Sequence, residues 1–473
     1  MTNLGYTPEE AIAAISTPLS PGAIGIVRTS GKNCIDLVSK IFSRPKALLE
    51  AKGNTLLYGW IVDGQEKESV KIDEVMLGVY RSPKSFTGED MVEIFCHGGV
   101  NVVTSILKLL LQNGFRQAQK GEFTFRAYIN GKTDLTKAEA IKEIIDSKTD
   151  ASRGRAAGRL AGNLFQEIDS IKKLIVDTLA AIEVGIEYPE DEETIADSFD
   201  QTNLEEARKR LSSLKDSWKS EKLYQDGARV VLAGKTNAGK SSLFNSLLKE
   251  ERAIVSDIEG TTRDWIESWV SFDGIPARLF DTAGLRQTQD KIEARGVELT
   301  KDLSHEADII LYIADSRNRL DKEDLDFIKS QKGLPILLVW NKCDLTSLNA
   351  ENSQENQKEK LPDGIEAEVF VSAKNSTGIG KLSQAVKEII CKKNAGQTDR
   401  LQAGLGSERQ KESVSEALER VCHALEIAQN GDYGLDAVVQ DLEDSLDSLG
   451  EVTGSVRPDD VLSSIFSHFC VGK

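Results

Sequence analysis

A glycine-rich segment near the middle of the chain has the residue types needed to hold a phosphate group. GKTNAGKS spans residues 234–241 and directly follows ARVVLA, an apolar run that is typical of a strand. Gly234 and Gly239 allow the backbone to turn its N–H groups toward phosphate oxygens, and Lys240 supplies positive charge. The Ser241 hydroxyl can bind Mg²⁺. Between a strand and a helix, this pattern predicts the phosphate-binding loop of a nucleotide hydrolase.

Three further segments indicate that the bound base is guanine. DTAG, NKCD and SAK follow in this order, each at the end of a strand-like run. Asp281 can orient a magnesium-bound water, and the Gly284 N–H can contact the γ-phosphate. The Asp344 carboxylate can accept both N–H donors on the Watson–Crick edge of guanine, which adenine does not present in that arrangement. Because loops beyond strand ends bind ligands in α/β sheets, the segments together predict a Ras-like GTPase.

The segment SDIEGTT, at residues 256–262, lies between the phosphate loop and DTAG, and Thr262 is its natural Mg²⁺ ligand. The nucleotide-binding residues predicted from all these segments are Asn237, Ala238, Gly239, Lys240, Ser241, Ser242, Ser256, Asp257, Ile258, Glu259, Gly260, Thr261, Thr262, Asp281, Thr282, Ala283, Gly284, Asn341, Lys342, Asp344, Ser372, Ala373 and Lys374.

Leu285 occupies the position at which Ras-type GTPases carry a glutamine that orients the attacking water. Leucine has no polar group, so hydrolysis requires another source of charge and another water-orienting group. The Asn237 side-chain oxygen, together with backbone carbonyls of SDIEGTT, could hold K⁺ beside the phosphates and offset charge in the transition state. On residue chemistry alone, the alternative that Asn237 only shapes the loop has equal weight.

The elements that must position these residues form an alternating β/α block over about 227–392. Apolar residues at three- and four-residue spacing predict long helices before and after it. These helices cover 134–182, 203–223, 408–449 and 459–469. Each helical part alone would leave its apolar face uncovered, so we expect the GTPase domain to be inserted into one helical domain.

The N-terminal part mixes strands and helices and predicts an α+β domain. β-Branched and aromatic residues indicate strands at 23–31, 54–62, 73–82 and 91–99. Apolar spacing predicts helices at 33–43 and 100–112. The polar stretch 349–364 is expected to be an exposed loop. The expected domains are 1–127, α+β; 128–226, helical; 227–392, inserted GTPase; and 393–473, helical.

Composition limits the class of protein. A chain of 473 residues, 40% hydrophobic and 29% charged, suits two or three globular domains. It has no apolar run long enough for a membrane span and no secretory signal pattern. The six cysteines contain no CxxC pair, which argues against a structural zinc site and a disulfide framework. We therefore expect a reducing, cytosolic location. With a net charge of −17, the chain would bind RNA only through a local basic patch.

Five stretches, from three parts of the chain, resemble the MnmE/TrmE family of tRNA modification GTPases, and the resemblance covers nearly the whole chain. GKTNAGKSSLFNSLL, AIVSDIEGTTRD and DTAGLRQTQDKIEARGVE are similar to the family's GTPase domain. KGEFTFRAYINGKTDLTKAEAI resembles the hinge between its N-terminal and helical domains, and DDVLSSIFSHFCVGK resembles its C-terminal signature. Val471 and Ser256 replace the commoner isoleucine and threonine, and Ser256 keeps a hydroxyl and a carbonyl.

The resemblance implies specific ligands. Asn237, Ser256, Ile258 and Thr261 would bind K⁺, and Ser241 and Thr262 would bind Mg²⁺. Glu293 would orient the attacking water, although residue type alone favours an ordinary exposed glutamate. The N-terminal domain would dimerise and bind formyl- or methylene-tetrahydrofolate. The residues expected at the folate are Arg28, Glu93, Lys132 and Lys473, with Cys470 beside it as a nucleophile or acid.

The same resemblance implies a function. The chain would form a homodimer and act with a flavin-dependent partner of the MnmG (GidA) family, as a heterotetramer, to add an aminomethyl-type group to the wobble uridine of tRNA. A regulatory or ribosome-assembly GTPase without modification chemistry is the main alternative, and a folate enzyme that GTP only regulates is another. Arg153, Arg155 and Arg159, with Lys148, are candidate RNA contacts, but a solvated helix face is the favoured interpretation.

Overall fold

The computed structural model describes residues 10–64, 70–187, 201–250, 266–281, 307–331, 333–346, 362, 364–393, 403–430, 435–455, 462 and 465–472. The chain divides into two compact units, residues 1–142 with 440–473 and residues 143–439. The second unit is therefore inserted in the sequence of the first. This division into two units does not test the four expected domains, so their boundaries stay predictions.

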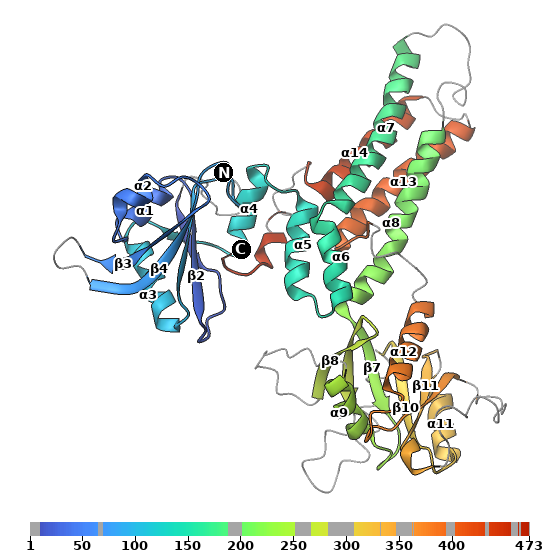
Figure 1. Ribbon diagram of the computed structural model, residues 1–473. Helices are drawn as coiled ribbons and strands as arrows, with labels where there is room; N and C mark the ends of the chain where they lie inside the picture. The colour runs from blue at the N-terminus through green and yellow to red at the C-terminus, as the bar shows by residue number, and fades with distance from the viewer. Residues whose placement is uncertain are drawn as a thin grey trace. The chain divides into compact units, whose positions relative to one another are not determined.

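A twisted sheet forms most of the first unit (Figure 1). It has six strands in the order β3-β4-β5-β2-β1-β6. Its strands are β1 (Ile12–Ile15), β2 (Ile24–Ser30), β3 (Thr55–Asp63), β4 (Val70–Tyr80), β5 (Met91–His97) and β6 (Arg116–Gln117). One face packs on the helices α1 (Cys34–Ser39), α2 (Pro45–Leu49) and α3 (Val100–Gln112). Strand alternation explains this core, since Ile61, Val75 and Leu77 point to the helices and are buried.

The opposite face of this sheet keeps large apolar side chains exposed. Tyr58 lies opposite Met76 on the neighbouring strand, and Met76 lies opposite Phe95 on the next. Tyr58 is 52% exposed, Leu56 61% and Met76 38%. The registers of β3, β4 and β5 therefore place a continuous apolar surface on the side of the sheet away from α1 and α3.

The C-terminal segment of the chain completes the first unit. The helix α4 (Glu122–Ile129) packs on it, with the Phe125 and Phe466 rings edge to face at 5.4 Å between centroids. The Tyr128 hydroxyl donates a hydrogen bond of 2.6 Å to the Gly454 carbonyl. Residues about 330 positions apart in the sequence therefore share one apolar core, as their numbers show.

Long helices form the first part of the second unit (Figure 1). They include α6 (Asp150–Leu160), α7 (Asn163–Glu187), α8 (Thr202–Asp226) and α13 (Glu408–Asn430), and α8 packs against the other three. The helices α5 (Leu135–Asp146) and α14 (Leu435–Thr453) cross the boundary between the units. None of the helices in the described residues is both long and apolar enough to cross a membrane.

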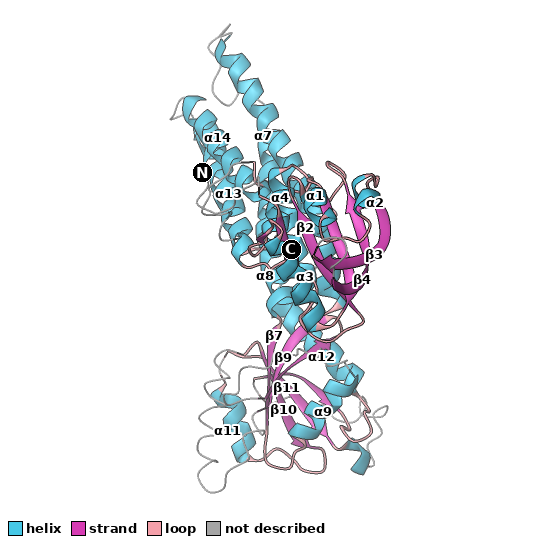
Figure 2. Cartoon of the chain, turned by 90° about the vertical axis from the view of Figure 1, so that its left-hand side faces the viewer, coloured by secondary structure: helices cyan, strands magenta, loops and turns pink. Residues whose placement is uncertain are grey.

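A second six-stranded sheet, in the order β12-β11-β10-β7-β9-β8, follows α8 directly. Its strands are β7 (Ala228–Ala233), β8 (Ile266–Phe272), β9 (Ile275–Asp281), β10 (Ile309–Asp315), β11 (Ile336–Asn341) and β12 (Ile365–Phe370). All neighbours are parallel except β8 with β9. The helices α9 (Lys240–Glu250) and α12 (Ile379–Lys393) cover one face and α11 (Lys322–Ser330) the other (Figure 2).

The multidomain fold class and most of the expected elements are confirmed. The strands predicted in the N-terminal part correspond to β2, β3, β4 and β5, and the helix predicted over 100–112 is α3. The helix predicted over 33–43 is wrong in length, because α1 ends at Ser39 and a bridge pairs Phe42 with Ile61. The predicted loop 349–364 lies outside the described residues except for positions 362 and 364.

Candidate functional site

The glycine-rich loop joins the end of β7 to the start of α9, as expected. Gly234 and Gly239 have φ angles of 132° and 95°, which side chains rarely adopt. A Cβ on Gly234 would lie 2.2 Å from the Ile313 carbonyl oxygen, so glycine is required there. The Lys240 ammonium donates to the carbonyls of Gly234 and Lys235 at 2.7 and 2.8 Å, inside the loop. Ser241 is the second residue of α9, where helix N–H groups favour anions.

Asn341, the first residue of NKCD, links the loops to one another. It ends β11 and is 2% exposed. Its side-chain amide donates to the Ala238 carbonyl at 3.0 Å, and its side-chain oxygen accepts from the Ala373 N–H at 3.1 Å. A single buried side chain thus holds the phosphate loop and the SAK segment at the same edge of the sheet.

Asp344 lies where it can recognise a base. The Ser372 hydroxyl donates to Asp344 Oδ1 at 2.7 Å, and the Asn375 N–H donates to that hydroxyl at 3.3 Å. Ser372 is 1% exposed, so the carboxylate is oriented by a group that cannot move freely. An oriented carboxylate can accept two parallel N–H donors, which fits the edge of guanine.

Lys342 spans the space between these loops. Its backbone has a φ of 65°, in the left-handed region, and its ammonium donates to the Asn237 carbonyl at 2.5 Å. The same ammonium lies 2.9 Å from Asp315 Oδ2, at the end of β10. We did not predict Asp315 from the sequence. The apolar run IILYIA before it was a signal, because Asp315 is a polar residue at the end of a strand, as in the other nucleotide-binding segments.

The structure describes only some of the remaining predicted site residues. Asp281 is the last residue of β9, whose register pairs it with Leu232 of β7, next to the phosphate loop. The Asn237 side chain is exposed, and its backbone carbonyl accepts from the Lys342 ammonium. The predicted site residues that lie outside the described residues are Ser256, Asp257, Ile258, Glu259, Gly260, Thr261, Thr262, Thr282, Ala283, Gly284, Glu293 and Lys473.

The first unit brings together two of the predicted folate contacts. Arg28 and Glu93 are opposite each other on β2 and β5, and their side chains form an ion pair with Nη2–Oε1 at 2.8 Å. The Tyr80 hydroxyl donates to the other Glu93 oxygen at 3.4 Å. Burial, with Glu93 nearby, raises the pKa of Tyr80, which keeps it a hydrogen-bond donor. The Arg28 guanidinium lies 5.4 Å from the centroid of the Phe86 ring.

Lys132 is connected to this pair through the loop between β4 and β5. Its ammonium donates to the Pro83 carbonyl at 3.0 Å, and the side chain is exposed. Phe86, in the same loop, is 39% exposed. The loop therefore contacts both predicted cations, Arg28 through Phe86 and Lys132 through Pro83.

The C-terminal tail docks at the same place. The Gly472 carbonyl accepts from Arg28 Nη1 at 3.4 Å and from the Ser16 hydroxyl at 3.2 Å. The Cys470 carbonyl accepts from the Gly121 N–H at 3.4 Å, while the cysteine side chain is exposed. These backbone contacts hold Cys470 two residues from the carbonyl that binds Arg28.

Two of the candidate RNA contacts are wrong. Arg159 is 3% exposed, and it forms ion pairs with Glu143 and, at 2.7 Å, with Glu221. Arg155 also pairs with Glu221, and its guanidinium lies 4.0 Å from the Tyr224 ring centroid. Both arginines hold α6 against α8, so neither the RNA-contact nor the solvated-face interpretation applies to them. Apolar spacing could not reveal this, because the partners are distant in sequence.

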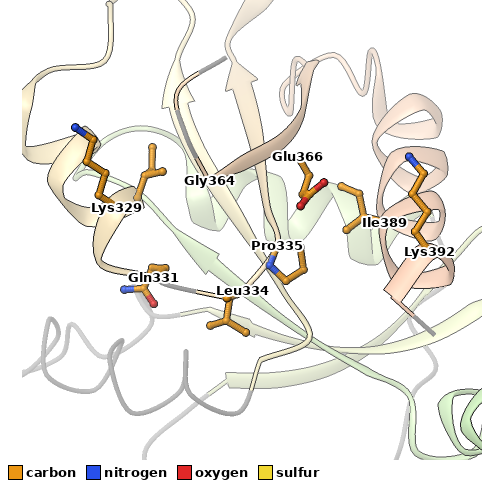
Figure 3. A pocket seen from close by; sticks show the side chains of 10 residues that line it. Lys329, Gln331, Leu334, Pro335, Gly364, Glu366, Ile389 and Lys392 are labelled. Atoms are coloured by element: carbon orange, nitrogen blue, oxygen red, sulfur yellow. The ribbon is translucent and has the colours of Figure 1, made fainter. Parts of the chain in front are cut away.

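A pocket of about 640 Å³ lies at the other edge of the GTPase-like sheet, before the starts of β11 and β12 (Figure 3). Leu334, Pro335 and Ile389 line it, with Lys329 and Lys392 beside it. The nucleotide-binding segments follow the carboxyl ends of the strands. The pocket is therefore distinct from the predicted nucleotide site.

Comparisons with known proteins show the family to which the chain belongs. The family model described as GTP-binding protein TrmE N-terminus matches residues 11–132, and the model of the MnmE helical domain matches residues 135–470. The tRNA modification GTPase MnmE of Treponema denticola is 52% identical over 99% of both chains. The relative of the same name from Carboxydothermus hydrogenoformans is 41% identical over 98% of this chain and 100% of that protein.

Solved structures also match in part. The G domain of the T. maritima FeoB iron transporter is 24% identical, covers 34% of this chain and 98% of its own, and has a TM-score of 0.26.

Proposed function

Since the chain belongs to the MnmE family of tRNA modification GTPases, we propose that it uses GTP hydrolysis to modify the wobble uridine of tRNA with a one-carbon folate. A flavin-dependent protein of the MnmG family would be the partner, and an aminomethyl or carboxymethylaminomethyl group the product. The observation that carries the folate chemistry is the C-terminal tail, because its Gly472 carbonyl binds the Arg28 of the Arg28–Glu93 pair.

GTP would bind across the loops at the carboxyl ends of β7, β10 and β11. Lys240 would turn from the loop carbonyls toward the phosphates, and Asp344 would accept the guanine N–H groups. The Ser241 hydroxyl, with Thr262, would hold Mg²⁺, which neutralises phosphate charge when bound. Ser241 fits this role, since hydroxyl oxygen is a ligand that Mg²⁺ accepts.

Potassium would replace the missing glutamine in part. The Asn237 side chain fits a monovalent cation, because it is exposed in the phosphate loop and its amide oxygen can act as a ligand. Ser256, Ile258 and Thr261 would complete the ligand set, and K⁺ would supply positive charge in the transition state. Glu293 would orient the attacking water.

The folate would bind at the open side of the first unit. The carboxylate of Glu93 is held by Arg28. It suits a pterin, because the amino and ring N–H donors of a pterin need an acceptor. Lys132 and Lys473 would meet the carboxylates of the glutamate tail. The thiol of Cys470, which is exposed beside this site, would act on the one-carbon unit as nucleophile or acid.

A second copy of the chain would cover the open sheet face of the first unit. Exposed apolar side chains on the neighbouring strands β3 and β4 are a surface that monomers rarely leave in water. Because this face also carries Arg28 and Glu93, dimerisation would enclose the folate. We place the activity in the cytoplasm, where tRNA is modified and cysteines stay reduced.

Analysis of nucleosides in cellular tRNA tests the proposal. Cys470→Ser should keep GTP hydrolysis near the wild-type rate but leave the wobble uridine unmodified. Glu293→Ala should bind GTP and lose hydrolysis by about 10²-fold or more, with the same tRNA defect. If cells with Cys470→Ser and cells with Glu293→Ala both contain normal levels of modified uridine, the tRNA-modification function is overturned. Normal levels with Cys470→Ser only would remove the role of its thiol.

A further inference from the structure

We propose that Asp315 is a positioning residue for the guanine nucleotide, because its carboxylate holds Lys342 across the phosphate loop. Asp315 lies in none of the segments that predicted the nucleotide site. It ends β10 and is the register partner of Asn341 on β11, directly before Lys342. The inference rests on the guanine nucleotide binding proposed for these loops.

The Lys342 ammonium bridges two strand ends. It donates to the Asn237 carbonyl at 2.5 Å and lies 2.9 Å from Asp315 Oδ2. The Asn237 carbonyl belongs to the phosphate loop, and Asp315 belongs to a neighbouring strand. An ammonium is a strongly hydrated point charge on a flexible stem, so without the carboxylate Lys342 would have only one neutral acceptor to hold it.

The carboxylate is itself held in place. Arg317 donates to Asp315 Oδ1 through Nε at 3.0 Å and to Oδ2 through Nη2 at 2.7 Å. The Arg317 backbone N–H adds a third bond, to Oδ1, at 3.1 Å. Hydrogen bonds from Arg317, and then from Lys342, hold the pKa of Asp315 below its usual range. Asp315, at 11% side-chain exposure, therefore stays ionised and oriented.

This arrangement fixes Lys342 between the two ends of the nucleotide site. Asn341 holds the phosphate loop, and Asp344, two positions after Lys342, is the base-reading carboxylate. A lysine that is already fixed loses less freedom when the nucleotide binds, so affinity rises without a change in the chemical step. Asp315 should accordingly affect nucleotide binding and release, and not the rate of bond cleavage.

Asp315→Asn tests this in the full-length protein, because it removes the charge at nearly constant shape. Fluorescent mant-GDP and a mant-labelled non-hydrolysable GTP analogue should bind about tenfold more weakly, the effect of one charge-assisted hydrogen bond. Release should become faster, and kcat at saturating GTP should stay within about twofold. Asp273→Asn is the matched control, since Asp273 also holds a lysine, Lys387 at 2.6 Å, away from the loops. The control should bind both probes as wild type does.

A double-mutant cycle separates positioning from general stability. In the Lys342→Met background, which keeps the stem and removes the ammonium, Asp315→Asn should weaken binding no further. Additive losses in the cycle, or wild-type affinity in Asp315→Asn, would overturn the inference. If the asparagine variant unfolds, Asp315→Ser replaces it, because the hydroxyl can still accept the Arg317 backbone N–H. Failure of the wild type and the control to bind guanine nucleotides would instead overturn the proposed function.

Discussion

At the scale of single residues, the base specificity of the site depends on the charge of Asp344. Its Oδ1 accepts from Ser372, which orients the carboxylate toward the two N–H donors of guanine proposed to bind there. Asp344→Asn should weaken GTP binding by roughly 1–3 kcal/mol and favour xanthosine triphosphate, because an amide N–H meets a carbonyl better than an amino group. Competition between the two nucleotides in an equilibrium binding assay checks this. Unchanged GTP affinity would show that NKCD does not read the base.

Hydrolysis should depend on the kind of monovalent cation. With leucine in place of the usual glutamine, we expect the GTPase rate to be about 10- to 100-fold higher in KCl than in NaCl, since K⁺ stabilises transition-state charge. Asn237→Ala should abolish most of that stimulation while Mg²⁺-dependent nucleotide binding persists. Rates in matched chloride salts at equal ionic strength give the answer. A rate that is the same in both salts, or an alanine variant that K⁺ still stimulates, contradicts the potassium site.

At the scale of elements, the buried Arg159 holds three helices together. Its ion pairs reach Glu143 on α5 and Glu221 on α8, from its own position on α6. Arg159→Ala removes the shared partner of the partly buried Glu143 and the buried Glu221, which keeps only Arg155, so the free energy of unfolding should fall by about 3 kcal/mol. Helix-monitored urea unfolding measures it.

Arg153 on the same helix is the matched control for Arg159. It is 59% exposed and pairs with the exposed Asp150, so Arg153→Ala should change stability by less than about 0.5 kcal/mol. Equal shifts in the unfolding midpoints of the two variants would mean that burial of the ion pairs contributes nothing.

The elements also show what the sequence could predict. Long helices and the β/α block were predicted because apolar spacing and glycine loops are local signals. The four-residue β1, IAAI, was missed because it is too short to show alternation. Asp315 was missed and Arg159 misread for a different reason: each has its function through a partner that is near only after folding. Arg28 and Glu93 were expected as folate contacts only from family resemblance, and their ion pair was not predicted, since no spacing in the sequence brings positions 28 and 93 together.

At the scale of the whole molecule, the open sheet face should hold two copies of the chain together. Burying a large apolar side chain contributes about 1.5–3 kcal/mol, so Leu56→Lys with Met76→Lys should weaken dimerisation by roughly 10²-fold or more. Sedimentation equilibrium over a range of concentrations measures the dissociation constant. Val176→Lys is the control, because Val176 is similarly exposed, at 47%, but lies on α7. A wild-type monomer, or a double variant as dimeric as the control, rules out this face as the interface.

The nesting of one unit inside the other has a consequence for synthesis. A ribosome makes the β-sheet of the first unit early, then residues 143–439, and only afterwards Phe466 and Gly472, which that first unit needs. Domains usually fold as they leave the ribosome, so the inserted unit can fold while the first unit still lacks its last helix and tail. A chain that ended before Gly472 would then have folded nucleotide loops, while its Arg28 would lack the contact with the Gly472 carbonyl. We expect such a product to hydrolyse GTP without modifying tRNA. The C-terminal tail would in this way restrict tRNA modification to chains that contain it.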